Sequence, residues 1–276
     1  MSIYVIAILF AISIAIILPS LRWLKINYHA VYFENLPKHM VGFRVLQISD
    51  LHNRSSKKKT FDIWQKIRKM KENPQKKLPF DIAVITGDVV LRRAGQIIPH
   101  REDFVWLASH VPTFYVEGNH DSPHYGKISL FLEECGIKCL YNEKVTIEHN
   151  GGLVDVIGTK DFVQLRKEKY AGLCELFADK THFSVVLTHQ PQVWDKFKDS
   201  QPDFTLSGHT HGGQVRLPFL PTLYAPRQGI FPKYGRGFYY HGNSKLYVSV
   251  GVGATDFPLR FWNRPAIEIF ELFEQL

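Results

Sequence analysis

The order of apolar and amphipathic segments along the chain predicts a layered α/β fold. Short runs rich in Val, Ile, Phe and Thr, each long enough for one buried strand, alternate with longer stretches that suit helices. Each of these runs also ends in a cluster of polar residues. Strands that alternate with helices are typical of layered α/β architectures.

The predicted elements follow one another in a regular order. The runs that predict buried strands are Phe43–Ser49, Ile82–Thr86, Thr113–Glu117, Ser184–Thr188 and Phe204–Ser207. The stretches that predict helices are Thr60–Glu72, Glu102–His110, Gly126–Glu134 and Asp161–Ala178. The sequence Asn150-Gly151-Gly152 predicts a hairpin turn between Val145–Glu148 and Leu153–Ile157. Two later strands, Leu246–Val250 and Ala266–Phe270, complete a sheet-rich C-terminal half.

The first 21 residues carry no charged side chain and contain a dense apolar run from Ile3 to Leu18. At about 1.5 Å per helical residue, this run is just long enough to cross a hydrocarbon layer of about 30 Å. Arg22 and Lys25 follow the run, with Trp23 between them. Basic residues and an interfacial aromatic on that side favour a retained membrane anchor with the globular part in the cytoplasm. We therefore predict a transmembrane anchor over residues 1–25.

This N-terminal segment has two other interpretations. A secretory signal peptide would need a basic region before the apolar run and a small-residue cleavage site after it, and the sequence has neither. A buried N-terminal helix remains the alternative to the anchor. The three cysteines are too scattered for a disulfide framework or a zinc spacing, which favours a reducing compartment.

The formal net charge of +8 arises between Arg54 and Lys77, where ten basic residues stand against Asp62 and Glu72. Phe61, Trp64 and Ile67 fall near helical spacing there, which predicts a helix with a narrow apolar stripe and a basic face. The basic face suits either solvent or anionic lipid headgroups. Nucleic acid is the less favoured partner, because no groove-reading motif accompanies the charge.

The residues that follow the predicted strands carry the chemistry. These clusters are Asp50-Leu51-His52, Gly87-Asp88, Gly118-Asn119-His120-Asp121, His189 and Gly208-His209-Thr210-His211. Open α/β sheets place their sites at the carboxyl ends of strands, where all five clusters are expected to lie. In Asp-x-His and His-x-His, alternate residues of an extended segment project to one side, so each pair is expected to reach one ion. Carboxylates and imidazoles suit Mn, Fe or Zn.

This ordered set of clusters resembles the calcineurin-like metallophosphoesterase superfamily, from about Phe43 to the C-terminus. Segments after His211 resemble a bacterial membrane-associated branch, the YkuE- and YaeI-type phosphoesterases. These segments are Gly212-Gly213-Gln214-Val215-Arg216-Leu217-Pro218, Tyr224-Ala225-Pro226, Phe231-Pro232-Lys233-Tyr234-Gly235 and Leu259-Arg260-Phe261. The resemblance implies a four-layer αββα metallophosphoesterase sandwich over residues 40–276, behind an N-terminal membrane-anchor helix. It also implies localisation at the bacterial inner membrane, where the basic residues after the apolar run favour a catalytic domain that faces the cytoplasm.

Position by position, the resemblance assigns two groups of metal ligands. It implies Asp50, His52 and His211 for the first ion, Asn119, His189 and His209 for the second, and Asp88 as the bridge. His120 is the implied proton donor or phosphoryl-oxygen stabiliser, and Asp121 is expected to hold the His120 imidazole in orientation. The implied cofactor is a pair of divalent ions, Mn first and Fe or Zn as alternatives, which would make a bridging hydroxide the nucleophile.

The resulting functional hypothesis is the hydrolysis of a phosphodiester or pyrophosphate bond at a membrane. Relatives of this branch include the chlamydial-type enzyme that cleaves UDP-2,3-diacylglucosamine in lipid A synthesis, so a nucleotide-linked lipid is the expected kind of substrate. Arg216, close after the last cluster, is a candidate contact for the substrate phosphate or an exposed strand residue. The alternatives are hydrolysis of a soluble substrate, since a fold does not determine its substrate, and a non-catalytic scaffold.

Overall fold

The computed structural model of the chain describes residues 4, 24–52, 63–70, 79–90, 101–160, 171–178, 180–217, 220–253 and 260–275. Most of the expected anchor over residues 1–25, and most of the basic Arg54–Lys77 segment, therefore lie outside the described residues. Within the described ranges, no helix has both the length and the apolar character to cross a membrane.

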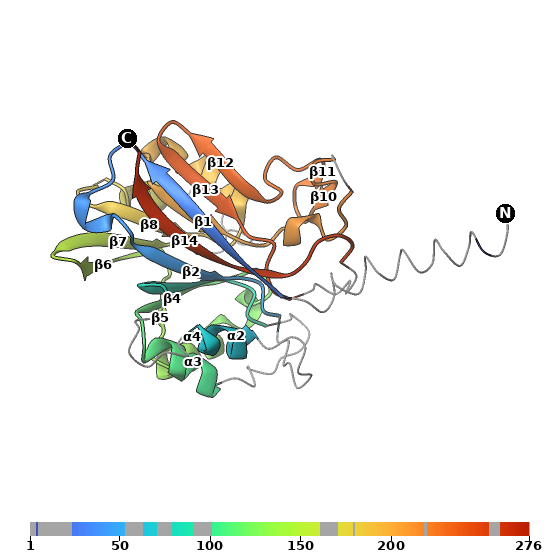
Figure 1. The fold of residues 1–276 in the computed structure, drawn as a ribbon, viewed down its shortest axis with the longest axis horizontal. Helices are drawn as coiled ribbons and strands as arrows, with labels where there is room; N and C mark the ends of the chain where they lie inside the picture. Colours follow the sequence, from blue (N-terminus) through green and yellow to red (C-terminus); the bar gives the residue numbers. More distant parts are fainter. Residues whose placement is uncertain are drawn as a thin grey trace.

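The first sheet has six strands in the order β1, β14, β2, β3, β4, β5 (Figure 1). These strands are β1 (Lys25–Phe33), β2 (Arg44–Ile48), β3 (Ile82–Thr86), β4 (Thr113–Val116), β5 (Lys138–Cys139) and β14 (Ala266–Glu274). Strands β2 to β5 are parallel, β14 is antiparallel to β2, and β1 is parallel to β14. The carboxyl ends of β2, β3 and β4 therefore share one edge.

The second sheet also has six strands, in the order β12, β13, β9, β8, β7, β6. These strands are β6 (Glu143–His149), β7 (Gly152–Gly158), β8 (Phe183–Leu187), β9 (Phe204–Ser207), β12 (Gly237–His241) and β13 (Ser244–Val248). The four central strands are parallel, and β6 and β12 form antiparallel edges. Asn150 and Gly151 join β6 to β7 with φ values of 49° and 75°, which is the geometry of a type I′ turn and confirms the predicted hairpin.

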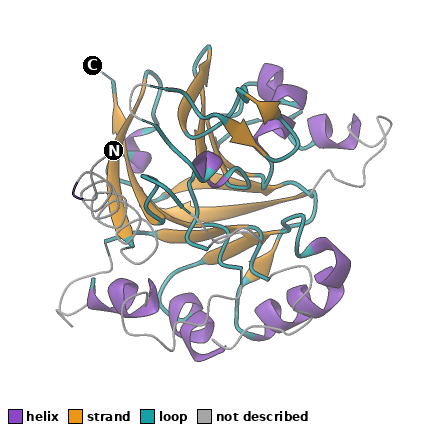
Figure 2. Ribbon diagram, turned by 90° about the vertical axis from the view of Figure 1, so that its right-hand side faces the viewer, coloured by secondary structure: helices purple, strands orange, loops and turns teal. Residues whose placement is uncertain are grey.

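Three clusters of buried apolar side chains hold the two sheets and their helices together. Figure 2 shows the strands in the middle of the molecule and the helices outside them. Helices α2 (Ile63–Lys69), α3 (Arg101–Ala108) and α4 (Tyr125–Glu134) cover the outer face of the first sheet. The short helix α5 (Ala171–Glu175) and the 3₁₀ turn η5 (Pro191–Lys196) cover the second. Alternate side chains of β2 belong to different clusters. Leu46 and Ile48 pack between the first sheet and its helices, whereas Val45 packs between the two sheets.

The predicted central strands are confirmed as β2, β3, β4, β8 and β9, each within one residue at either end. The helices expected at Glu102–His110 and Gly126–Glu134 correspond to α3 and α4. The two-residue strands β5, β10 (Tyr224–Ala225) and β11 (Gly229–Ile230) were not predicted, and neither were two longer strands, β1 and β12. Both lie at the edge of a sheet and are largely exposed or half-buried, since β1 has only two buried residues and β12 has none, so neither is a buried strand with the continuous apolar run that such strands carry. Because β1 pairs along its whole length with β14, the sheet begins at Lys25, before the domain boundary expected at residue 40.

The basic helix α2 packs as a surface helix on the first sheet. Ile63, Trp64 and Ile67 are buried, as the predicted apolar stripe requires. Two of its basic side chains contact protein, because Lys66 Nζ donates to the carbonyl of Leu24 (2.7 Å) and Arg68 pairs with Asp103 (2.7 Å). The basic face is thus partly used for packing within the domain.

Candidate metal centre

Ligand-bearing loops from both sheets meet at one edge of the molecule. The loops that follow β2 and β3 in the first sheet carry Asp50, His52 and Asp88, and the loop after β4 carries Asn119 and His120. The loops that follow β8 and β9 in the second sheet carry His189, His209 and His211. The expectation that every cluster lies at the carboxyl end of a strand is confirmed, and we call this edge the metal edge.

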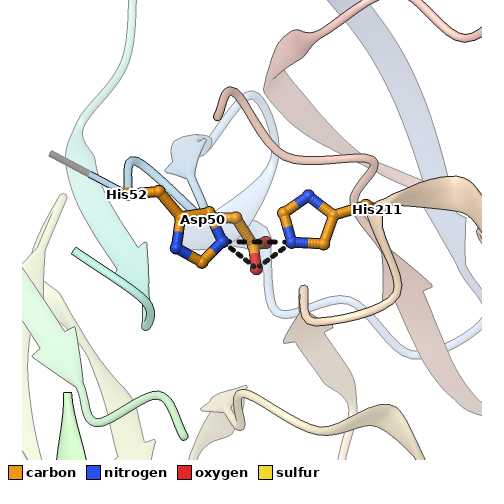
Figure 3. Close-up of side chains that lie close together, drawn as sticks. All are labelled: Asp50, His52 and His211. Carbon is orange, nitrogen blue, oxygen red and sulfur yellow. Dashed lines mark hydrogen bonds and ion pairs between the residues drawn. The ribbon is translucent and has the colours of Figure 1, made fainter. Parts of the chain in front are cut away.

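Asp50, His52 and His211 form the first cluster of possible ligands, here called group one (Figure 3). The Nε2 atoms of His52 and His211 lie 3.1 Å apart. Asp50 Oδ1 lies 3.4 Å from His211 Nε2 and 4.0 Å from His52 Nε2. All three side chains are buried and point toward a common centre.

Asp88, His189 and His209 form the second cluster, here called group two. His189 Nε2 lies 3.3 Å from both Asp88 Oδ2 and His209 Nδ1. The amide oxygen of Asn119 lies 3.2 Å from the same nitrogen, so it faces group two as the resemblance implied. Four oxygen and nitrogen atoms therefore converge on one point.

Asp88 lies between the two groups. Its Oδ2 atom is 3.3 Å from His189 Nε2 in group two and 3.8 Å from His52 Nε2 in group one. Its Oδ1 atom accepts a hydrogen bond from the backbone amide of His120 (2.8 Å). This placement is that of a carboxylate able to serve both groups at once.

The backbone at the ligands is left-handed. Asp50, His52, Asp88, His209 and His211 have φ values of 55°, 50°, 55°, 72° and 50°. The expectation of extended segments is therefore wrong, and so is its consequence for His-x-His, because His209 faces group two and His211 faces group one. Left-handed backbone costs non-glycine residues about 1–3 kcal/mol each and is concentrated at functional sites.

Glycines beside the ligands allow close approach of the loops. A Cβ atom at Gly118 would overlap the backbone and carboxylate of Asp88, and one at Gly208 would overlap Ser49 and Asp50. These glycines therefore allow neighbouring loops to contact each other closely beneath the ligands.

Burial favours the neutral form that can bind a cation in His52, His209 and His211. It lowers the pKa of His52 to about 4 and that of His209 to about 3, and it lowers the pKa of His211 well below the usual value. Burial also raises the pKa of Asp50 to about 6. For Asp88 burial opposes ionisation, but the neighbouring His189 and His52 lower its pKa below the usual range.

The donor set fits a pair of divalent cations. The Nδ1 atom of His189 lies 2.8 Å from the carbonyl oxygen of Thr86, which can only accept, so the neutral ring carries its hydrogen on Nδ1. Its Nε2 lone pair then faces the oxygens of Asp88 and Asn119, which offer lone pairs as well. Ligand atoms about 2.0–2.2 Å from one ion lie about 2.8–4.4 Å from each other, a range that includes the separations of 3.1–4.0 Å given above for the two groups.

His120 is half-buried and lies beside group one. Its ring centroid is 5.0 Å from that of His52, in an edge-to-face arrangement. The backbone amide of His120 is held by Asp88, so the position of this imidazole depends on the carboxylate between the groups.

Asp121 occupies a different place from the one expected. Its carboxylate accepts hydrogen bonds from the backbone amides of Val89, Val90 and Gly118 (3.0–3.2 Å) and from the hydroxyl of Tyr115 (2.8 Å). Instead of orienting the His120 imidazole, the buried carboxylate therefore joins the loops that follow β3 and β4. Sequence spacing could not distinguish these roles, because both place a carboxylate next to His120.

Arg216 is half-buried beside a short bridge between Val215 and Phe261, and burial and the charge of Arg236 lower its pKa. The structure instead brings Arg260 to the ligands. Arg260 is buried, its Nη2 atom lies 3.1 Å from His211 Nδ1, and it donates to the carbonyls of Val250 and Gly253.

Asn263 also reaches the ligand turn, because its side-chain amide donates to the carbonyl of His211 (2.6 Å). Sequence reasoning gave neither Arg260 nor Asn263 a role. Arg260 lies within a quoted motif, Leu259-Arg260-Phe261, and that was the available signal.

Gln47 stabilises the metal edge through two buried hydrogen bonds. Its side-chain amide donates to Thr86 Oγ1 and to the carbonyl of Ser207, both at 2.9 Å and both buried. Thr86 lies two residues before Asp88, and Ser207 lies two residues before His209. One side chain on the first sheet therefore ties together ligand loops from both sheets.

Comparison with known proteins agrees with the family resemblance of the sequence motifs. The family model described as calcineurin-like phosphoesterase matches residues 43–213. The chain is 29% identical over 250 residues to the metallophosphoesterase YkuE of Bacillus subtilis, covering 88% of this chain and 84% of YkuE. It is 30% identical over 199 residues to the phosphodiesterase YaeI of Escherichia coli, covering 70% of each chain. A Helicobacter pylori metallophosphoesterase is 30% identical over 243 residues, covering 86% of this chain and 60% of that protein.

Proposed function

The chain belongs to the calcineurin-like phosphoesterase family and is a metal-dependent phosphoesterase, and from this premise we propose that it hydrolyses a phosphodiester or diphosphate bond in a membrane-associated substrate. The observation that carries the proposal is the placement of Asp88 Oδ2 between two buried ligand groups. Asp50, His52 and His211 would hold one cation and Asp88, His189 and His209 the other, and the pair would supply an activated water and stabilise charge on phosphoryl oxygens. Manganese is the proposed metal. The donor set would also accept iron or zinc, which are the alternatives.

The residues around the cations position the substrate and move its protons. Asn119 would bind through its amide oxygen, which adds no charge to group two. His120 is half-exposed at the centre and would donate a proton to the departing oxygen, or hold a phosphoryl oxygen by a hydrogen bond. Asp121 would keep the loops that carry Asp88 and His120 in register. Arg216 remains the proposed contact for a more distant phosphate oxygen.

The proposed substrate class is a nucleotide-linked or phosphoester lipid, of which UDP-2,3-diacylglucosamine is the example to test. The similarity to the phosphodiesterase YaeI supports the phosphodiester bond, and the apolar N-terminal run Ile3 to Leu18 supports a substrate at a membrane. The proposed location is the bacterial inner membrane, with the anchor in residues 1–25, the basic Arg54–Lys77 segment at the lipid surface and the catalytic domain in the cytoplasm.

The test is a substrate panel assayed with Mn²⁺. The full chain, Asp88→Ala and His120→Ala are incubated with a generic soluble phosphodiester, a phosphomonoester and UDP-2,3-diacylglucosamine. We expect metal-dependent hydrolysis that Asp88→Ala abolishes and His120→Ala slows by about 10²–10⁴-fold. Activity that persists without metal, or unchanged turnover in Asp88→Ala, would refute the mechanism. Hydrolysis of the soluble esters alone would favour a soluble substrate.

The topology has its own test. A reporter that is active only outside the cytoplasm is fused to the C-terminus of the full chain. We expect it to remain inactive, and an active reporter would overturn the proposed orientation.

A further inference from the structure

The beginning of β1 lies at the metal edge. β1 is parallel to β14, and β14 is antiparallel to β2, so β1 begins where β2 ends. The backbone amide of Lys25 donates to the carbonyl of Pro265 (2.8 Å), just before β14. Residues 1–23, with their apolar run Ile3 to Leu18, therefore join the described domain at the edge that carries the ligand groups.

Large apolar side chains face solvent at the same edge. Tyr224 in β10 (Tyr224–Ala225) is paired directly with Ile230 in β11 (Gly229–Ile230), so the two side chains share one face of this hairpin. They are 55% and 75% exposed, and Phe231, the next residue, is 64% exposed. Trp262 is 50% exposed. We call Tyr224, Ile230, Phe231 and Trp262 the apolar rim.

The apolar rim adjoins the ligand groups. β10 contacts the turn η7 (His211–Gly213), which begins with a group-one ligand. Trp262 stands between Arg260 and Asn263, and both of these side chains contact His211. In Figure 1 the hairpin and the beginning of β1 lie toward the same end of the molecule, and Figure 2 views that end.

The segment that carries the hairpin is positively charged. From His211 to Gly237 the sequence contains Arg216, Arg227, Lys233 and Arg236 and no Asp or Glu. Arg227 and Arg236 are exposed. Exposed apolar side chains among basic ones complement a surface that presents both acyl chains and anionic headgroups.

We propose that the apolar rim docks on the surface of an anionic phospholipid bilayer, so that the metal edge faces the membrane. The inference deepens the proposed function, because the docked edge is the one that holds the proposed catalytic centre. A protein partner could also cover exposed apolar side chains. The basic segment and the apolar N-terminal run at the same edge favour lipid as the occupant.

The docking is tested by fluorescence quenching, which needs no catalysis. The full chain is mixed with vesicles of brominated phosphatidylcholine and phosphatidylglycerol and compared with its Trp262→Phe variant. We expect a part of the quenching to disappear in Trp262→Phe, because the bromine atoms lie in the acyl region that the rim enters. The matched control is Trp106→Phe, which should leave the quenching unchanged. Trp106 lies on α3 and packs against the apolar cluster between the first sheet and its helices.

A second pair of variants tests the apolar contact itself. Ile230→Asp should lose most of the Trp262-dependent quenching, whereas Leu130→Asp, at a residue 59% exposed on α4, should retain it. Equal quenching in the full chain and Trp262→Phe would overturn the docking. So would self-association that shields Trp262 without vesicles. Hydrolysis of a soluble phosphodiester by the same preparation reports separately on the proposed function, so the two proposals fail independently.

Discussion

Group one and group two use the same ligand types, one carboxylate and two imidazoles, but their surroundings differ. In group two the Thr86 carbonyl keeps the hydrogen of His189 on Nδ1, which leaves Nε2 ready for a cation. In group one the guanidinium of Arg260 lies 3.1 Å from His211 Nδ1. A neutral His211 that binds through Nε2 must carry its hydrogen on Nδ1, facing that positive charge.

The pKa values of the two carboxylates, Asp50 in group one and Asp88 in group two, also favour a cation in group two. Burial raises the pKa of Asp50 to about 6, although His189 opposes this. The imidazoles of His189 and His52 outweigh the effect of burial at Asp88 and lower its pKa. The difference teaches that two centres with the same carboxylate and imidazole ligands need not be equal in affinity, and we infer that group two, which also has the amide oxygen of Asn119, binds its cation more tightly.

The largest expected effect comes from Asp88→Asn. This change keeps the size of the side chain and removes the charge that lies between both groups. We expect turnover to fall by more than the 10- to 100-fold that is typical for residues outside the ligand shell. Steady-state hydrolysis of a soluble phosphodiester in saturating Mn²⁺ measures it. Asp195→Asn, at a carboxylate that binds Lys198 and Lys233 away from the ligands, is the control.

Two histidine variants distinguish the affinities of the groups. His211→Ala should leave one bound Mn²⁺ per chain, because group two keeps all its ligands. His189→Ala should leave less than one, because the remaining group is the weaker. Equilibrium dialysis with metal analysis counts the ions, and equal losses in the two variants would remove the proposed difference.

The pH dependence of metal binding is a further test of the difference in affinity between group one and group two. A cation displaces protons from its ligands, so affinity falls as pH falls. Asp50, with its pKa raised to about 6, gains a proton before Asp88, whose pKa is lowered. We therefore expect the number of bound ions to fall from two to one as pH falls through about 6. Loss of both ions in a single step would contradict this order.

The smallest expected effect is on the scaffold that joins the groups. Gln47→Leu removes the two hydrogen bonds that tie the first sheet to Thr86 and Ser207. Leaving these buried acceptors without a donor should lower the free energy of unfolding by about 1–3 kcal/mol. Urea denaturation measures the change. Gln65→Leu, at an exposed position on α2, should change it by less than about 0.5 kcal/mol.

The central strands and the ligand clusters could be predicted from the sequence because burial on both faces leaves continuous apolar runs. β3, Ile82–Thr86, is buried throughout and was predicted residue for residue. β1 was missed because its first residues alternate between exposed and half-buried, and its partner β14 is more than 200 residues away. Pairing over such a distance leaves no local pattern.

The composition of the centre was predictable, but its geometry was not. Asp-x-His and His-x-His mark ligands, yet the left-handed backbone at His209 and His211 sends neighbouring histidines to different groups. Arg260 lies 49 residues from His211, and the motif Leu259-Arg260-Phe261 marks the segment without showing which residue it contacts. Asp121 shows the same limit, since only the folded loops reveal which amides it binds.

The central claim is that two ligand groups share Asp88 and hold one cation each. A crystal structure of the chain grown with Mn²⁺, with data collected at the manganese absorption edge, tests it directly. We predict two anomalous peaks about 3.5–4 Å apart, one at group one and one at group two, with Asp88 between them. A single peak, or peaks away from these residues, would contradict the account.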